Sequence, residues 1–391
     1  MRPVVVIILH APSSGVGRLS AACADARLAL AERHAAGFRA AGAADVRIIA
    51  DPDARPFGAR LRAVAAGLPA GAGLVVLGSG SLPLASAGDR RAFVAAAADP
   101  DGPALANNRY SGDAIAVPDA ARVLAAVPDL PGDNALPRWL DERAGRPVRD
   151  VRGRAHLQAD LDGVADLALL IRSRRCPAAL RDAADVMGAD LAALDGRLDA
   201  IARVGTDRRA EIVVAGRVSA AGLAHLEHAT AGRVRALVEE RGLRAADPRA
   251  LADPVDAAAG AEPAPQPFPA HGPRPVQRPP ASVLGMLLDR DGPQGLGPAL
   301  ARLGDAALVD SRVLLAHRLG ADERRWPPLE DRLASDLGLA AAVADPWLRA
   351  LTESADAAGI PVALGGHSLV GPGLRLLFST SRGARRPGAR R

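Results

Sequence analysis

The 391-residue chain contains no lysine, so all 49 of its lysine-plus-arginine side chains are arginine. This absence excludes a phosphate loop of the Walker A type, which needs a lysine beside the phosphates. It also excludes a Schiff-base enzyme and a nucleophile activated by lysine. These exclusions hold whatever the origin of the arginine bias.

Cysteine, aromatic residues and long apolar runs are also scarce. The two cysteines, Cys23 and Cys176, exclude a disulfide framework and a cysteine-based zinc cluster. Aromatic side chains make up 2% of the chain, which removes the stacking platforms of single-strand nucleic-acid binders. No run approaches the ~20 apolar residues of a membrane span. The start, MRPVVVIILHAPSSG, is interpreted as a first strand rather than a secretion signal, because its apolar run is short and passes into a Gly/Ser turn. We expect a cytoplasmic protein without a membrane partner.

The net charge of +5 comes from the end of the chain. Residues 381–391 carry five arginines and no acid, and the remainder carries equal numbers of basic and acidic side chains. A short tail of this kind is typical of a disordered, solubilising end. The sequence therefore predicts a neutral folded body that does not bind nucleic acid.

The first 170 residues alternate strand and helix patterns, which predicts a mostly parallel, helix-covered sheet. Strands are expected at residues 3–10, 45–50, 73–78, 114–117 and 147–151. Helices are expected at residues 19–41, 58–67, 87–98, 119–126, 135–144 and 163–172. We therefore predict an α/β fold, GT-A-like or Rossmann-like, for a first domain over residues 1–175.

A helical connector over residues 176–209 and a second, smaller α/β domain over residues 210–380 are expected to follow. The second domain is predicted to contain a strand at 211–216, a long helix at 219–241 and buried apolar segments at 282–288, 307–315 and 360–364. Residues 246–281 hold ten of the chain's 32 prolines and cannot form a regular helix or ladder. They are either an insertion in this domain or a linker between two small units, and we favour the insertion.

Four motifs follow the elements of the first domain in order. The loop after the first strand, HAPSSGVGRL at 10–19, opens a helix where backbone N–H groups and an arginine can meet phosphates. It is followed by LGSGSLPL at 77–84, NNRYSGDAIAV at 107–117 and ADLDGVADLALL at 159–170. This set resembles the nucleotide-diphospho-sugar transferase superfamily, which has a GT-A-like fold and includes MobA-like molybdenum-cofactor guanylyltransferases, phospholactate guanylyltransferases and small bacterial glycosyltransferases. The resemblance covers about residues 3–172.

The resemblance implies a nucleotide site, an acceptor site and a catalytic set. The nucleotide-binding residues are expected to be Ala11, Pro12, Ser13, Ser14, Gly15, Gly17, Arg18, Ser79 and Ser81. The acceptor-binding residues are expected to be Asn107, Asn108, Arg109, Tyr110 and Asp113. The expected catalytic residues are Arg18, Asp113, Asp160 and Asp162, of which Asp160 and Asp162 would hold Mg²⁺ or Mn²⁺ on the phosphates.

The chain departs from this family at two places that the chemistry uses. Ser79 and Ser81 stand where the family has a metal-binding aspartate, and a neutral hydroxyl is a poor ligand for a hard divalent cation. The first loop has no lysine, and Arg18 is not equivalent to lysine at a single-point phosphate contact. Two functions therefore stay open. One is a nucleotide- or nucleotide-sugar-binding nucleotidyltransferase or glycosyltransferase, and the other is a catalytically inactive GT-A-like domain that binds a ligand or acts as a scaffold.

Each motif also has a purely structural interpretation. The glycines of the first loop suit a plain strand-to-helix turn. The serines after the third strand suit a helix N-cap, and so do the two leading acids of the last motif. The third motif contains turn residues that could simply end a loop, although its dense polarity beside a strand favours membership of a site.

A lesser alternative is a dinucleotide-binding oxidoreductase. Gly15, Gly17 and Ser20 follow a strand and open a helix, and Asp51 and Asp53 end the second strand. However, the third glycine of that fingerprint is absent, and Gly15 and Asp51 are farther apart than the ~20 residues expected between fingerprint and ribose-binding acid.

The second half carries weaker signals. Arg217 and Ser219 follow a strand and begin a helix, which makes them the second-best anion site in the chain. The segment LGGHSLVGPG at 364–373 could bind an anion through backbone N–H groups, although a turn is the simpler interpretation. His225 and His228 suit a solvated helix face better than a metal site.

Overall fold

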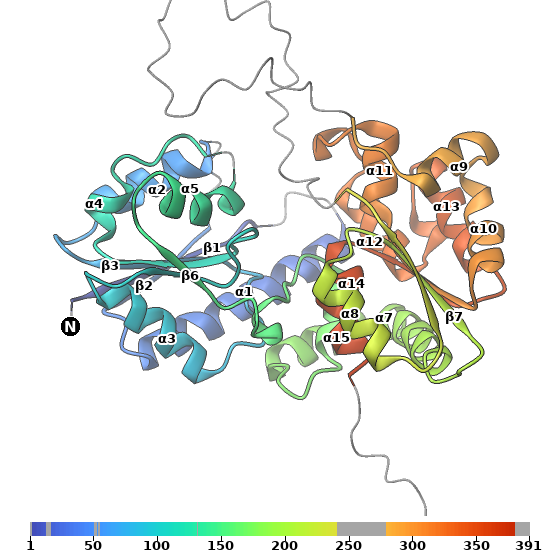
Figure 1. Cartoon of the computed structure of the whole chain (residues 1–391), viewed down its shortest axis with the longest axis horizontal. Coiled ribbons are helices and arrows are strands. Elements are labelled where there is room, and N and C mark those ends of the chain that lie inside the picture. Colours follow the sequence, from blue (N-terminus) through green and yellow to red (C-terminus); the bar gives the residue numbers. More distant parts are fainter. Residues whose placement is uncertain are drawn as a thin grey trace, which may run out of the picture.

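The computed structural model describes residues 2–12, 17–50, 53, 55–130, 132–240 and 279–379. Within these ranges the protein is α/β, with two separate sheets that are each covered by helices (Figure 1). The predicted fold class, with parallel-rich sheets in more than one domain, is therefore confirmed.

The first sheet has six strands in the order β2-β1-β3-β5-β4-β6. They are β1 (Val4–Leu9), β2 (Asp45–Ile49), β3 (Gly73–Gly78), β4 (Ala104–Ala106), β5 (Ala114–Val117) and β6 (Val148–Asp150). β5 runs antiparallel to both of its neighbours, and the other pairs are parallel. β1 and β3 read VVVIIL and GLVVLG, and such uninterrupted apolar runs are typical of strands that are buried on both faces. We call this sheet with its helices the N-terminal lobe.

Helices cover both faces of this sheet. They are α1 (Arg18–Ala40) and α3 (Ala87–Ala98) on one face, and α2 (Phe57–Ala66), α4 (Ala120–Leu124) and α5 (Leu136–Glu142) on the other. Because side chains of a strand alternate between its faces, Val6 and Ile8 of β1 pack with α1 and α3, whereas Val5 and Ile7 pack with α2. The sheet is thus a buried middle layer that holds the ends of its strands in place.

Most elements of this half lie where the sequence predicts them. The strands expected at 73–78 and 114–117 and the helix expected at 87–98 have the predicted bounds, and the others differ by one or two residues at an end. β4 was not predicted, because the three residues between Pro103 and Asn107 are too few to carry a periodic pattern.

The second sheet has four strands, all parallel, in the order β10-β9-β7-β8. They are β7 (Glu211–Gly216), β8 (Arg233–Val238), β9 (Ala306–Asp310) and β10 (Val362–Gly365). The helices packed with them are α6 (Val164–Leu170), α7 (Ala178–Val204), α8 (Ala220–Ala229), α9 (Val283–Asp291), α10 (Leu296–Leu303), α11 (Ser311–Leu319), α12 (Leu329–Leu337), α13 (Pro346–Asp356), α14 (His367–Val370) and α15 (Gly373–Leu377). We call this sheet with its helices the C-terminal lobe.

The prediction of one long helix over residues 219–241 is wrong. α8 ends at Ala229, and β8 begins four residues later as the edge strand of the second sheet. The turn between them passes through Gly232, where a β-carbon would lie 2.3 Å from the carbonyl oxygen of Ala210. Arg233 and Arg235 of β8 form ion pairs with Glu211 on the neighbouring strand. Pairing with β7 therefore overrides the local helical pattern.

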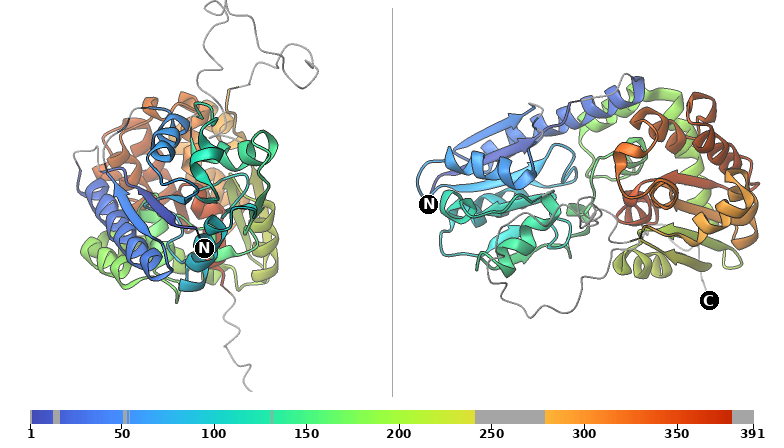
Figure 2. Two further views of the ribbon diagram at one scale, coloured as in Figure 1. Left: turned by 90° about the vertical axis from the view of Figure 1, so that its left-hand side faces the viewer. Right: turned by 90° about the horizontal axis from the view of Figure 1, so that it is seen from above.

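α1 extends from one lobe to the other (Figure 2). Its C-terminal half packs on the first sheet through Ala31, Ala35 and Phe38, whereas Leu19 and Cys23 in its first turns belong to the core of the C-terminal lobe. The predicted helical connector is α7, which packs against α1, α6 and the strands of the second sheet. The two lobes therefore share a helix rather than a flexible joint.

The strands on either side of residues 241–278 belong to the same sheet. Glu239 at the end of β8 accepts the N–H of Val283 at 2.6 Å, and Glu240 accepts the N–H of Ala281 at 3.0 Å. Most of the proline-rich residues 246–281, and the tail 381–391, lie outside the described residues. None of the helices in the described ranges is long and apolar enough to cross a membrane.

Candidate functional site

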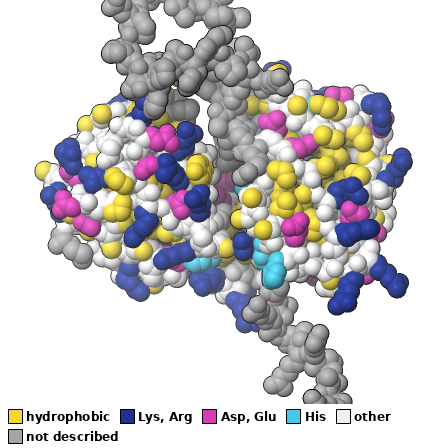
Figure 3. Space-filling view, in the orientation of Figure 1, with side chains coloured by type: hydrophobic (Ala, Val, Ile, Leu, Met, Phe, Trp, Pro, Cys, Tyr) yellow, Lys and Arg dark blue, Asp and Glu magenta, His cyan; other side chains and the backbone are white. Residues whose placement is uncertain are grey.

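The carboxyl ends of the strands in the two sheets lie close to each other. In each sheet the strand order reverses at one place, where the chain crosses from one side of the first strand to the other. This switch point lies between β1 and β3 in the N-terminal lobe and between β7 and β9 in the C-terminal lobe. Such switch points are where α/β sheets bind ligands. Residues 159–163 join the two edges, because Asp160 forms a β-bridge with Ser81, and Gly163 begins α6, which reaches β10 where Ala165 lies beside Gly365. Figure 3 shows a groove between the two lobes.

His10 and Ser79 meet at the switch point of the N-terminal lobe. His10 follows β1 and Ser79 follows β3, and His10 Nδ1 lies 3.1 Å from Ser79 Oγ. Both side chains are buried. Burial lowers the pKa of His10, the nearby charge of Arg27 lowers it further, and Asp25 acts in the opposite direction. The ring is therefore neutral near pH 7 and can act as a hydrogen-bond partner or a general base.

A second histidine holds the loop that carries Ser81. His34 of α1 lies 2.9 Å through Nε2 from the carbonyl oxygen of Ser81, and Arg90 of α3 donates to its Nδ1 at 3.4 Å. Because a guanidinium can only donate, Nδ1 is the acceptor and the ring proton lies on Nε2. Burial lowers the pKa of His34 to about 3, with a further contribution from Arg90. A neutral histidine thus positions this loop.

A cavity of about 480 Å³ lies beside this switch point, between the first sheet and α2. Its floor is apolar and includes Leu9 and Ile49, the last residues of β1 and β2, and Phe57 of α2. Its rim carries Asp53, Arg55 and Arg60. The hydrogen bond from Arg55 holds the pKa of Asp53 at about 2, so this carboxylate is ionised. The volume and the lining, mostly apolar with a few fixed polar groups, are typical of small-molecule sites.

The predicted phosphate-contacting loop is only partly described. Ser13, Ser14 and Gly15 lie outside the described residues, and Ala11 and Pro12 are exposed. Gly17 immediately precedes α1. The side chain of Arg18 is 64% exposed and forms an ion pair with Asp190 of α7. The side chain of Arg18, at the start of α1, is therefore paired with α7 instead of lying at the β1–β3 switch point.

The N-terminus of α1 already holds a carboxylate. Glu330 of α12 accepts the N–H groups of Leu19 at 2.9 Å and Ser20 at 2.8 Å. An acidic group is stabilised there by the unpaired N–H groups and the helix dipole. Glu330 thus links the lobes at the position where the sequence predicts phosphate contact, and no sequence signal indicated it, because the two partners are about 310 residues apart.

We expect Glu330→Ala to loosen this link. Loss of a capping acceptor costs about 1 kcal/mol of helix stability. The amides of Leu19 and Ser20 should then exchange hydrogen faster in hydrogen-exchange mass spectrometry, while amides in the middle of α1 keep their protection. Glu353→Ala, on an exposed position of α13, is the matched control and should change neither set. Unchanged exchange at Leu19 and Ser20 would show that Glu330 does not cap α1 in solution.

The predicted acceptor loop is a hydrogen-bonded unit beside the same edge. The amide of Asn107, which is 1% exposed, donates to Asp113 at 3.0 Å, and Asn108 donates to Gln158 at 3.2 Å. Arg109 instead pairs with Asp141 of α5 at 2.5 Å. Tyr110 is 62% exposed, with Arg152 over its ring. The structure thus brings together Asn107, Asn108 and Asp113, and turns Arg109 away from them.

The acids predicted to hold a metal ion do not assemble a site with a third ligand. Asp160 is held by its β-bridge to Ser81, and the N–H of Asp162 donates to Asp166 at 2.9 Å. Asp166 also accepts the N–H of Gly163, so it is Asp166 that caps α6. Across the described ranges, no three His, Cys, Asp or Glu side chains lie close enough together to hold a metal ion. The described residues therefore offer no third His, Cys, Asp or Glu ligand for Mg²⁺ or Mn²⁺ beside Asp160 and Asp162.

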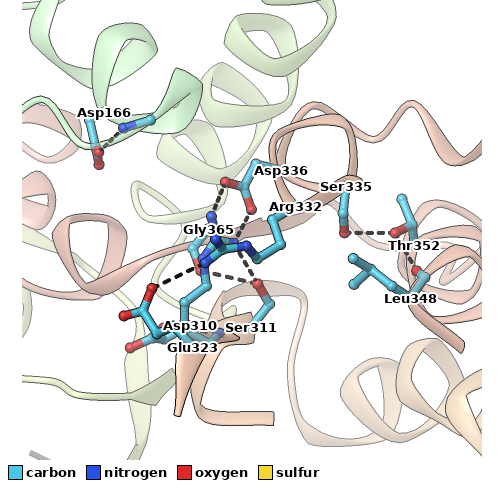
Figure 4. A network of polar contacts seen from close by, with 12 residues as sticks. Asp166, Asp310, Ser311, Glu323, Arg332, Ser335, Asp336, Leu348, Thr352 and Gly365 are labelled. Atoms are coloured by element: carbon cyan, nitrogen blue, oxygen red, sulfur yellow. Dashed lines mark hydrogen bonds and ion pairs between the residues drawn. The ribbon is translucent and has the colours of Figure 1, made fainter. Parts of the chain in front are cut away.

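The switch point of the C-terminal lobe contains two ion pairs shielded from solvent. Figure 4 labels their two acids, Asp310 and Asp336. Arg217, just after β7, donates from Nε to Asp310 at the end of β9 at 2.6 Å, and from Nη2 to the other carboxylate oxygen at 3.1 Å. Arg312 of α11 makes a similar two-point contact with Asp336 of α12. Asp310 and Asp336 are each 1% exposed. The anion that the sequence predicted at Arg217 is thus a carboxylate of the protein itself, Asp310. The acids that pair with these arginines were not identified from the sequence.

Backbone geometry explains how the first pair forms. Gly216 has φ +120°, and a β-carbon there would lie 2.4 Å from Cβ of Asp310. Only glycine fits this conformation and this close approach. Ser219, the other member of the weak signal, caps α8 by accepting the N–H of Gly222 at 2.9 Å. The guanidinium groups of Arg217 and Arg312 are thus paired with carboxylates, which connects the ends of β7 and β9 and joins α11 to α12.

No protein-family model matches this chain, and no curated protein is significantly similar to it.

Proposed function

We propose that this protein binds a nucleotide or a nucleotide-sugar in the N-terminal lobe and transfers a nucleotidyl or glycosyl group to an acceptor in the groove between the lobes. The observation that carries the proposal is the 480 Å³ cavity at the carboxyl ends of β1 and β2, next to the β1–β3 switch point. The apolar floor suits the faces of a base. The ionised carboxylate of Asp53 at the rim suits the hydroxyl groups of a ribose.

The remaining roles follow from the geometry around the cavity. Phosphates would lie at the switch point beside His10 and Ser79, and the acceptor would lie against Asn107, Asn108 and Asp113. His10 is the general base of the proposal, because its lowered pKa leaves the ring neutral and able to take the proton of an acceptor hydroxyl near pH 7. The hydroxyl oxygen would bond to the α-phosphorus of a nucleoside triphosphate as pyrophosphate leaves, or to the anomeric carbon of a nucleotide-sugar as the nucleoside diphosphate leaves. The resemblance to nucleotide-diphospho-sugar transferases supports phosphates at Ser79 and an acceptor at Asn107, Asn108 and Asp113, whereas the cavity is lined by other residues than those it implies for the nucleotide.

A binding module without catalysis is the second candidate. It is supported by Ser79 and Ser81 at the place of the family's metal-binding aspartate and by the carboxylate of Glu330 on the first turn of α1. In this case the nucleotide would bind in the same cavity, and the two lobes would present it to a partner without turnover.

Thermal unfolding in the presence of nucleoside triphosphates and nucleotide-sugars, each with EDTA or with Mn²⁺, tests both candidates. A ligand at 100 times its dissociation constant stabilises the folded state by roughly 2.7 kcal/mol, so the midpoint should rise measurably. Val64→Trp fills the cavity and should remove the rise, whereas Ala66→Trp, on an exposed position of the same helix, should keep it.

The outcomes separate the candidates. A rise accompanied by release of nucleotide or sugar products supports the transferase, and a rise without turnover, with or without Mn²⁺, supports the binding module. If no ligand of the panel raises the midpoint, or if Val64→Trp leaves the rise intact, nucleotide binding in this cavity is refuted.

A further inference from the structure

Arg27 of α1 lies near the carboxyl end of β3 in the N-terminal lobe. The sequence predicts no role for this arginine. It is seven residues before His34, so the two side chains lie on the same face of the helix. They contact consecutive residues of the loop after β3. His34 donates to the carbonyl of Ser81, and Cδ of Arg27 lies 3.4 Å from the β-carbon position of Gly80.

The backbone geometry at Gly80 holds this loop close to the other lobe. Gly80 accepts the N–H of Leu161 at 2.9 Å, and a β-carbon at Gly80 would lie 2.5 Å from the carbonyl oxygen of Leu161. The absence of a side chain allows the Arg27 side chain and residues 159–161 to approach the same turn. Arg27 therefore stands where the two lobes meet.

Arg27 forms no close ion pair with a carboxylate in the part of the chain that the structure describes. Arg27 takes part in none of the ion pairs among the described residues, and its Nε is buried without a hydrogen-bond partner there. By contrast, Arg18 pairs with Asp190, and the two arginines at the switch point of the C-terminal lobe pair with Asp310 and Asp336. A buried donor without an acceptor is unfavourable, so an anion that accepted from Arg27 would be stabilised.

The field of Arg27 reaches the switch point. Its positive charge is one of the causes that lower the pKa of His10, whose ring contacts Ser79. The side chain of Arg27 also lies beside Gly80, two residues after the end of β3. Guanidinium groups bind phosphate oxygens through two parallel hydrogen bonds.

We propose that Arg27 is the cation that binds the phosphate groups of the ligand at the β1–β3 switch point, in the role for which this chain has no lysine. This inference rests on the proposed nucleotide site and names the ligand chemistry there as a diphosphate or triphosphate ester. His10 and Ser79 lie on the other side of the same anion, and His34 keeps the loop of Gly80 and Ser81 in place.

The test compares Arg27→Gln, Arg27→Lys and the control Arg18→Gln with the wild-type chain. Binding of inorganic pyrophosphate, of a nucleoside diphosphate and of the corresponding nucleoside is measured by calorimetry, with the base that stabilises the protein most. Loss of one charge-assisted contact should weaken binding of the diphosphate and of pyrophosphate about 10- to 100-fold in Arg27→Gln. Nucleoside binding and the unfolding midpoint of the free protein should stay unchanged, Arg27→Lys should recover part of the affinity, and Arg18→Gln should behave as wild type.

The other possible results separate the role of Arg27 from the proposed nucleotide site. If Arg27→Gln binds the diphosphate as tightly as wild type, the inference is overturned while the proposed function stands. If Arg27→Gln loses nucleoside and diphosphate affinity equally, Arg27 has only a structural role. If the wild type binds pyrophosphate in an Arg27-dependent way but binds no nucleotide, the anion site stands and the nucleotide proposal fails. If it binds neither, both fail.

Discussion

Replacing Asp310 by asparagine should lower the free energy of unfolding by about 3–5 kcal/mol, because it leaves Arg217 buried without its counter-charge. Asparagine keeps the shape of aspartate and can still cap α11, so the substitution isolates the charge. Urea unfolding is the measurement, followed by tryptophan fluorescence. Two of the three tryptophans, Trp326 and Trp347, lie in the C-terminal lobe. The loss should appear as a lower midpoint with an unchanged slope.

Two further variants show whether the unpaired guanidinium is the cause. Arg217→Met in the Asp310→Asn background should restore part of the stability, because it removes the charge that lost its partner. Asp291→Asn breaks the exposed pair of Asp291 with Arg290 and should leave the midpoint unchanged. If Asp310→Asn costs no more stability than this control, or if adding Arg217→Met lowers stability further, the unpaired charge of Arg217 is not the cause of the loss.

Acidification should destabilise the protein through His34. The pKa of this buried ring is about 3 in the folded state and about 6.5 when the chain is unfolded. Between these values the unfolded chain binds a proton that the folded chain does not, so the stability from His34 rises with pH, by up to about 1.4 kcal/mol per pH unit. At pH 4.5 the contribution lost should therefore be about 2–3 kcal/mol relative to pH 7.

Asp166 acts in the opposite direction. Burial and the neighbouring Asp162 raise the pKa of its carboxyl group in the folded state, so stability from this group is present at low pH and is lost as pH rises through the folded pKa. The pH dependence of the wild type alone therefore mixes the two effects. The difference between wild type and His34→Gln isolates the histidine, because glutamine can still donate to Ser81 but does not titrate.

The measurement is the free energy of unfolding between pH 4.5 and pH 7.5 for the two proteins. We expect His34→Gln to be less sensitive to acid than wild type, and Asp166→Asn to be more sensitive. Parallel curves for wild type and His34→Gln would mean that the ring is protonated in the folded state or that its pKa is unshifted.

Much of the N-terminal lobe could be predicted from local sequence. Runs such as VVVIIL and GLVVLG and the apolar periodicity of the helices between them are decided by neighbours in the chain, and they lie at the predicted positions. Prediction failed where pairing with a distant strand decides the conformation. Residues 233–238 form β8 because β7 is there to pair with them, and the three-residue β4 exists only between β5 and β6.

The candidate site shows the same division. The sequence by itself determined which side chains follow the strands, among them His10, Ser79 and Ser81, and it determined that arginine is the basic residue available for any phosphate. Only the tertiary structure decided how these groups are used. It turned Arg18 toward Asp190, placed Glu330 on the N-terminus of α1 and brought Arg27 to Gly80. The physical reason is that strand and helix periodicity is a short-range property of the chain, whereas charge pairing and burial depend on groups that the fold brings together across hundreds of residues.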